Sequence, residues 1–294
     1  MSLEERKIKE GEDHVAAAYK YVETSVWKLK FTPDYDSAAN ELTKAAVCFK
    51  VGKNFKKAYE TNLKAAEAYT KCGNLYHAGK QIELALNIVR DVRDDPEDVE
   101  YLAERGGLLY RQAGSPESAA QLIVRAAKLL EMKDPMRAVG LYQKAADTVA
   151  TEDRDTEAAG HLEQAARLCV RSGEYDRAAE LLENCLSLYS NSGQSVSGTP
   201  YGRVVLAFVL VQEKRGDCVA AGKVWSRWGG LCDGQQAGAA NSIISGFSDC
   251  DPALAKSGLD SPTIKTLDND YVKLARDLDL PAGGEGEEGD IDLC

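Results

Sequence analysis

Eight cysteines and three histidines are the side chains of this 294-residue sequence that could serve as metal ligands or nucleophiles. No two cysteines have the Cys-x-x-Cys spacing that often supplies tetrahedral zinc sites, and the histidines are far apart in the sequence. The sequence therefore predicts no metal site. The residues are Cys48, Cys72, Cys169, Cys185, Cys218, Cys232, Cys250, Cys294, His14, His77 and His161.

Sequence signatures of catalysis are also missing. Cys48 or Cys72 with His77 could form a nucleophile and its base, but both cysteines stand near the ends of expected helices, so structural thiols are the simpler interpretation. There is no G-x-x-x-x-G-K-[ST] phosphate loop, no G-x-G-x-x-G after a strand and no G-x-S-x-G nucleophile elbow. We therefore expect no catalytic residues, no bound cofactor and no enzyme activity.

The composition favours a reduced, cytoplasmic protein. Apolar residues make up 44% and charged residues 28% of the chain, and no stretch approaches the ~20 consecutive apolar residues of a membrane-spanning helix. The charged start has no secretory signal, and cysteines without a disulfide framework are typical of a reducing compartment. The net charge of −11 argues against nucleic-acid binding, which needs a basic surface.

Small residues recur along the chain every 19 to 21 residues. Eight pairs of residues, most of them Ala-Ala, follow one another at this spacing. A large or apolar residue stands three positions after each pair, and a further small residue usually stands about eight positions before it. These columns lie on one face of a helix with 3.6 residues per turn. The pairs are Ala45-Ala46, Ala65-Ala66, Ala85-Leu86, Gly106-Gly107, Ala126-Ala127, Ala145-Ala146, Ala165-Ala166 and Cys185-Leu186.

Each of these units is therefore predicted to be one helix. Small residues let neighbouring helix backbones approach closely. Glycines after the units predict left-handed C-caps, and prolines predict the first turns of helices. These residues are Gly52, Gly73, Gly114, Gly173, Gly193, Pro96, Pro116 and Pro135. The predicted fold is all-α: a tetratricopeptide-like α-solenoid of antiparallel helix hairpins with a C-terminal helical bundle as a cap.

Four regions and about 13 or 14 helices are expected. An N-terminal helix and an apolar loop occupy residues 1–34, and the helical-repeat solenoid occupies residues 35–194. The repeat columns fade in residues 195–280, which we interpret as the helical cap, with helices expected near residues 201–214, 218–228, 234–247 and 268–278. The Gly-rich, acidic residues 281–294 have the composition of a disordered tail.

A basic residue precedes the small pair in five of the eight units. These residues are Lys44, Lys64, Arg105, Arg125 and Lys144. If alternate helices share a layer, Lys64, Arg105 and Lys144 lie on one face and the other two on the opposite face. They are either ordinary long side chains at the edge of the core or a basic stripe that binds an acidic partner.

Motifs at both ends, together with the repeats, carry a resemblance to a known family. The matching residues are Glu10-Gly11, His14, Lys20-Tyr21, Trp27, residues 33–38 (PDYDSA), residues 268–274 (DNDYVKL) and the acidic ending in Leu-Cys. With them the chain resembles the soluble NSF attachment proteins, and the gamma type most closely, over nearly its whole length.

The resemblance implies a non-enzymatic adaptor with macromolecular partners. Such a protein binds the SNARE complex, a rod of syntaxin-like and partner helices, and recruits the NSF ATPase, which takes the rod apart during vesicular transport. The resemblance also implies weak contact with a membrane surface. The alternative is a generic tetratricopeptide scaffold or cochaperone adaptor, whose peptide clamp needs ordered Lys and Asn positions that the repeats do not show.

Two further candidate sites lie outside the repeats. Val26, Trp27, Leu29 and Phe31 alternate with lysines in a loop before the first repeat, which predicts either burial on the first helices or peripheral membrane contact. Near the end of the chain, Asp290, Asp292 and Leu293 resemble the ending that the family presents to NSF. The alternative is a tail that only aids solubility.

Overall fold

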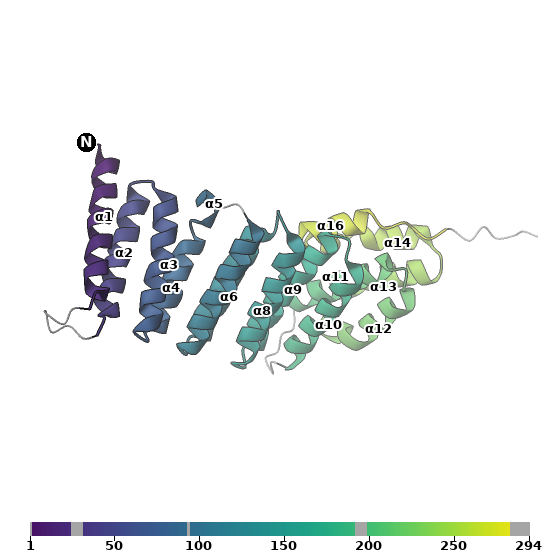
Figure 1. The fold of residues 1–294 in the computed structure, drawn as a ribbon. Coiled ribbons are helices and arrows are strands. Elements are labelled where there is room, and N and C mark those ends of the chain that lie inside the picture. The colour runs from purple at the N-terminus through teal and green to yellow at the C-terminus, as the bar shows by residue number, and fades with distance from the viewer. Residues whose placement is uncertain (1, 25–31, 93–94, 192–198, 283–294) are drawn as a thin grey trace, which may run out of the picture. The chain divides into compact units, whose positions relative to one another are not determined.

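The computed structural model describes residues 2–24, 32–92, 95–191 and 199–282 (Figure 1). These residues form helices and connecting turns without a strand among them, which confirms the all-α class. They include fourteen α-helices of eight or more residues, in agreement with the expected number, besides two four-residue α-helices and one 3₁₀ helix. Contacts within the chain define two compact units, Met1–Asp153 and Arg154–Cys294.

The first unit contains eight helices in its described residues. They are α1 (Leu3–Val22), α2 (Tyr35–Val51), α3 (Phe55–Lys71), α4 (Leu75–Leu86), α5 (Val89–Val92), α6 (Pro96–Gln112), α7 (Pro116–Leu130) and α8 (Pro135–Ala150). Apart from the short α5, consecutive helices from α1 to α8 pack against one another, and Figure 1 shows α1, α2, α3, α4 and α6 following one another in chain order. Helices α2, α3, α4, α6, α7 and α8 coincide with the first six predicted repeat units.

The residues of the three repeat columns form the core. Ala45, Ala65, Ala85, Ala126 and Ala145 are completely buried, and the residues of the second small column are buried with them. The large residues that follow the pairs, such as Phe49, Tyr69 and Tyr110, fill the spaces between neighbouring helices and are also buried. The 20-residue period therefore reflects helix packing, as the sequence predicts.

Gly106 and Gly107 stand where most other repeats have a pair of alanines, and the packing explains why. A Cβ atom on Gly106 would overlap Leu122 of α7 and lie 2.9 Å from Cγ2 of Ile82 in α4. On Gly107 it would lie 3.1 Å from Cδ1 of Ile123. Helix α6 therefore approaches both neighbours more closely than alanine allows.

The helix ends follow the predicted signals with one exception. Gly73, Gly114 and Gly173 have positive φ angles of 81°, 73° and 79°, as expected of left-handed C-caps. The prediction is wrong for Gly52, whose φ is −76°. A Cβ atom there would lie 2.8 Å from Cγ1 of Ile8, so this glycine permits the close approach of α1. Gly193 lies outside the described residues.

The second unit also has eight α-helices in its described part. They are α9 (Asp155–Arg171), α10 (Tyr175–Asn191), α11 (Thr199–Lys214), α12 (Cys218–Trp228), α13 (Gly234–Ser248), α14 (Pro252–Leu259), α15 (Pro262–Lys265) and α16 (Asn269–Arg276), with the 3₁₀ helix η1 (Gly229–Leu231) after α12. Helix α11 packs against α10, α12, α13 and α16, and its residues from Val204 to Val211 are buried on every side.

A buried carboxylate fixes α16 on α9. Asp270 accepts hydrogen bonds from Arg171 at 2.8 Å and from Arg167 at 3.3 Å. Tyr271 and Leu274 of the same helix are buried beside it. The D-N-D-Y-x-K-L element that carries part of the family resemblance therefore contributes to the packing of the second unit.

Candidate functional site

Alternate helices of the first unit form two layers. Ion pairs connect α3 to α1, α6 to α3 and α8 to α6, so these four helices lie in one layer. The pairs are Lys57–Glu12 (2.6 Å), Arg105–Glu67 (3.8 Å) and Arg137–Glu97 (3.2 Å). A pair between Arg125 and Glu83 (2.6 Å) connects α7 to α4 in the other layer, which α2 continues by alternation. We call the surface of α1, α3, α6 and α8 the groove face and that of α2, α4 and α7 the reverse face.

The five basic residues before the small pairs are divided between these surfaces. Lys64, Arg105 and Lys144 lie on helices of the groove face, whereas Lys44 and Arg125 lie on helices of the reverse face. The side chain of Lys144 pairs with Glu104 and lies 3.7 Å from Glu100.

Carboxylates accompany most of these cations. Lys44 pairs with Glu41 at 2.7 Å, and Arg105, Arg125 and Lys144 each reach a glutamate of the preceding helix in the same layer. Among the described residues, Lys64 is the member of the set without a carboxylate partner. Its Nζ atom lies 3.4 Å from the hydroxyl of Tyr19 and 6.0 Å from the centre of that ring. Four of the five predicted basic residues are therefore paired with carboxylates.

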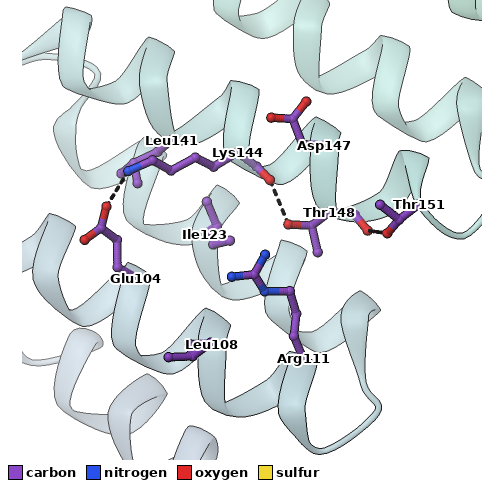
Figure 2. Close-up of a pocket in the computed structure, with 9 residues that line it drawn as sticks. All are labelled: Glu104, Leu108, Arg111, Ile123, Leu141, Lys144, Asp147, Thr148 and Thr151. Carbon is purple, nitrogen blue, oxygen red and sulfur yellow. Dashed lines mark hydrogen bonds and ion pairs between the residues drawn. The ribbon is translucent and has the colours of Figure 1, made fainter.

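A groove of the groove face lies between α6 and α8 (Figure 2). It has a volume of about 520 Å³, and Ile123 of α7 and Leu141 of α8 form its apolar floor. Leu108 of α6 is 47% exposed at its side, and the Lys144–Glu104 pair crosses one end. Arg111 and Asp147 add one charge of each sign. The groove can receive an apolar side chain while charged groups bind the polar atoms around it.

A second groove of about 240 Å³ lies between α1 and α3, with Ala38 and Leu42 of α2 among its lining residues. Tyr19, Lys64 and Lys71 line it as well, and Tyr19 is 54% exposed. Both grooves therefore combine exposed apolar surface with lysine side chains on the same layer of helices.

The charges of these sites persist at neutral pH. A hydrogen bond to Glu104, with Glu100 nearby, holds the pKa of Lys144 above its ordinary value. Burial acts to raise the pKa of Glu83, but Lys80, Tyr110 and Arg125 outweigh it and hold that pKa below the ordinary value. Lys144 and Glu83 are therefore both charged in neutral solution.

Two of the predicted sites fall outside the described residues. These are the loop residues Val26, Trp27, Leu29 and Phe31 and the tail residues Asp290, Asp292 and Leu293. Next to the loop, α1 ends at Val22 and the backbone N–H of Asp34 donates a hydrogen bond to the carbonyl of Tyr21 at 3.0 Å. None of the described helices combines the length and apolar character that crossing a membrane requires.

Cys48, Cys72 and His77, which the sequence allowed as a nucleophile and its base, have other neighbours in the structure. The thiol of Cys72 donates to the carbonyl of Tyr69, and His77 is hydrogen-bonded to Asn74 at 2.8 Å. Cys48 instead lies beside Glu10 and His14 of α1, in a cluster of possible metal ligands.

Three exposed side chains of the groove face were not predicted as site residues. Tyr19 lies on α1, and Tyr101 and Leu108 are apolar residues at surface positions of α6. The sequence could have identified Leu108, because the equivalent residues of α3 and α8 are the charged residues Glu67 and Asp147. Apolar residues at otherwise polar repeat positions indicate a binding surface.

The stacked helices, grooved surface and mixed charges define a helical-repeat protein with a face suited to binding other macromolecules. Residues 9–200 match the family model described as "Soluble NSF attachment protein, SNAP". The chain belongs to the soluble NSF attachment protein family.

Curated relatives agree with this family over most of the chain. The gamma-soluble NSF attachment protein of Dictyostelium discoideum is 24% identical, with 95% of this chain and 85% of that protein covered. The protein of the same name from Arabidopsis thaliana is 20% identical, with 87% of each chain covered. These relatives confirm the resemblance to the gamma type.

A solved structure of a tetratricopeptide repeat protein from Parabacteroides merdae is also similar. It is 12% identical at a TM-score of 0.27, with 91% of this chain and 99% of that chain covered.

Proposed function

We propose that this protein is a non-enzymatic adaptor that binds assembled SNARE complexes and recruits and activates the NSF ATPase for their disassembly. It would thereby act in vesicle-mediated transport, intracellular protein transport and membrane fusion. The observation that carries the proposal is the family match over residues 9–200, together with relatives of the same type along nearly the whole chain.

The groove face is the proposed SNARE-binding surface. A SNARE complex is a rod of helices with apolar and charged side chains on its outside, and a row of parallel grooves offers both kinds of contact. Lys64 supports this assignment because its charge is the least compensated of the five basic residues. Lys144 and Arg105 extend the same face, and the apolar groove beside Lys144 gives it depth.

The remaining parts of the chain have separate roles in this proposal. Residues 35–194 supply the binding surface, and the helical cap at residues 195–280 supports the acidic tail. Asp290, Asp292 and Leu293 contact the ATPase, while Trp27 and its neighbours hold the protein weakly at the membrane from the cytoplasmic side. Trp favours the bilayer interface, and Lys28 and Lys30 favour its anionic surface.

Reconstituted disassembly tests the proposal. Purified protein is added to NSF, Mg²⁺–ATP and a preassembled SNARE bundle whose helices carry a fluorescence donor and acceptor. We expect ATP-dependent separation of the labels that requires the protein, and none with a non-hydrolysable nucleotide. If the protein neither binds the bundle nor increases its disassembly, the proposal is wrong. Binding without recruitment of NSF would instead indicate a scaffold.

A further inference from the structure

Three side chains with metal-binding atoms converge between the first two helices. Glu10 and His14 are four residues apart on α1 and so share one side of that helix. Cys48 comes from α2, which packs directly against α1. A carboxylate oxygen, an imidazole nitrogen and the thiol sulfur of these residues all lie within 4.8 Å of one another.

Close packing of the two helices brings the ligands together. Gly11, the residue after Glu10, is buried against Phe49, the residue after Cys48. A Cβ atom on Gly11 would lie only 2.8 Å from Cε1 of the Phe49 ring. The glycine therefore lets α1 lie near enough for Glu10 to meet the buried thiol, while Glu10 itself remains accessible to an ion from solvent.

The imidazole of His14 is already oriented by a carboxylate. Its Nδ1 atom lies 2.6 Å from Oε2 of Glu41, and the other oxygen of Glu41 accepts a hydrogen bond from Lys44 at 2.7 Å. Histidines that bind metals usually direct one ring nitrogen to a carboxylate or carbonyl and give the other to the metal. With Nδ1 held by Glu41, Nε2 is the nitrogen that a metal would take.

We infer that Glu10, His14 and Cys48 form a Zn²⁺ site that links α1 to α2. Thiolate, imidazole and carboxylate are the common protein ligands of zinc, and three of them leave a fourth tetrahedral position for water. On binding, the hydrated ion loses water molecules and the thiol proton of Cys48 passes to solvent as the sulfur–zinc bond forms.

Glu10 can join this site while it keeps its ion pair. Lys7 contacts its Oε2 atom at 2.7 Å, which leaves Oε1 for the metal. The ion would fix α1 on the first repeat, and α1 also supplies Tyr19 to the groove next to Lys64. The sequence predicts no such site because 33 residues separate His14 from Cys48, and only the helix hairpin brings them together.

Titration of the reduced, tag-free full-length protein with Co²⁺ tests the site. Thiolate ligation should produce a sulfur-to-cobalt charge-transfer band that saturates at one ion per chain and disappears when Zn²⁺ is added. Cys48→Ala should abolish the band, whereas Cys72→Ala, which removes an exposed cysteine, should leave it intact. Absence of the band in the wild-type protein, or its survival in Cys48→Ala, would overturn the inference.

Because Cys48 is buried, Cys48→Ala could lose the band by disturbing the fold rather than by removing a ligand. Variants at the more accessible ligands separate these two causes. Glu10→Gln and His14→Gln should each lower the Zn²⁺ affinity by roughly tenfold or more, measured by competition with a chromogenic chelator. Asp13→Asn, at an exposed residue of the same helix, should leave the affinity unchanged. Circular dichroism confirms that each variant is folded. Equal affinity in all three variants would contradict the site.

Discussion

The Gly106-Gly107 pair contributes to stability through the close contact that it permits. Gly106→Ala should lower the free energy of unfolding by about 1–3 kcal/mol, because a methyl group overlaps Leu122 and crowds Ile82. The matched control is Gly140→Ala, where an added Cβ meets nothing within 4 Å. There the better helix propensity of alanine should stabilise α8 by up to ~1 kcal/mol. Urea unfolding of both variants measures the difference, and equal stabilities would contradict this packing.

Glu213 makes the stability of the second unit depend on pH. It is only 5% exposed, and burial, reinforced by the charge of Asp217, raises its pKa to about 7 even though a hydrogen bond from the thiol of Cys218 acts to lower it. The unfolded carboxyl titrates near its ordinary value of 4.5. Between these values the folded state holds a proton that the unfolded state has lost. The free energy of unfolding therefore falls as the pH rises through this window, by up to ~3 kcal/mol.

Glu213→Gln should remove this dependence. The neutral amide has no charge to bury, so the variant should show a flatter stability profile between pH 5 and pH 8 and should exceed the wild-type protein in stability at pH 8. Glu180→Gln, at an exposed residue of α10, should retain the wild-type slope. Denaturant midpoints across this range measure the effect, and parallel profiles for all three proteins would show that Glu213 does not titrate as described.

Which residues are buried could be predicted from the sequence, but the partners of the charged residues could not. The 20-residue columns place Ala65 or Tyr110 in the core because helix periodicity alone decides that. The glutamate that Arg105 or Lys144 contacts lies on a helix about 40 residues earlier, and the angle between the two helices decides which side chains meet. Periodicity contains no information about that angle.

The loop between α1 and α2 is the element whose proposed membrane role can be tested separately from the rest. Trp27→Ser with Phe31→Ser should weaken liposome binding and slow the disassembly of membrane-anchored SNARE bundles, because these rings favour the bilayer interface. Disassembly of soluble bundles should be almost unchanged, since that reaction needs no membrane. Equal losses with both substrates, or early melting of the double variant, would indicate that the loop only packs on the helices.

The acidic tail is the second element with a separable role. Deletion of residues 281–294 should lower NSF activation and leave SNARE binding nearly intact, because the acidic residues and Leu293 are proposed to contact the ATPase. Sedimentation of the SNARE–protein complex and ATP hydrolysis by NSF measure the two steps. If activation survives the deletion, the contact belongs to the folded cap. On α16 it would have to use exposed residues such as Lys273, since Asp270 and Tyr271 are buried.

The helices that follow the repeat units, from α11 onward, were predicted less completely than the repeat helices. The expected helix at residues 218–228 matches α12, and those expected at residues 201–214 and 234–247 match α11 and α13 within two residues. Helices α14 and α15 were missed because they have only eight and four residues and no repeat column. Their packing is visible only in three dimensions: Gly246 allows the backbone of Ala255 to approach α13 at a distance that no side chain would permit.

For the whole molecule, the family and the fold class follow from the sequence, whereas the binding surface does not. The repeat predicts two layers of helices, and the end motifs predict the family. The grooves beside Lys64 and Lys144 depend on the spacing between α1 and α3 and between α6 and α8, which the side chains of three helices set together. The proposed choice of the groove face over the reverse face therefore rests on the structure.

The most direct test of this account is the rate of NSF-dependent SNARE disassembly by two charge-reversal variants. Lys64→Glu with Lys144→Glu changes the groove face, and Lys44→Glu with Arg125→Glu changes the reverse face by the same total charge. We expect the groove-face variant to be slower by roughly tenfold or more, because charge reversal at an interface reduces association. The reverse-face variant should retain nearly the wild-type rate, and circular dichroism should show both to be folded. Equal rates for the two variants, or a greater loss in the reverse-face variant, would contradict the assignment of SNARE binding to the groove face.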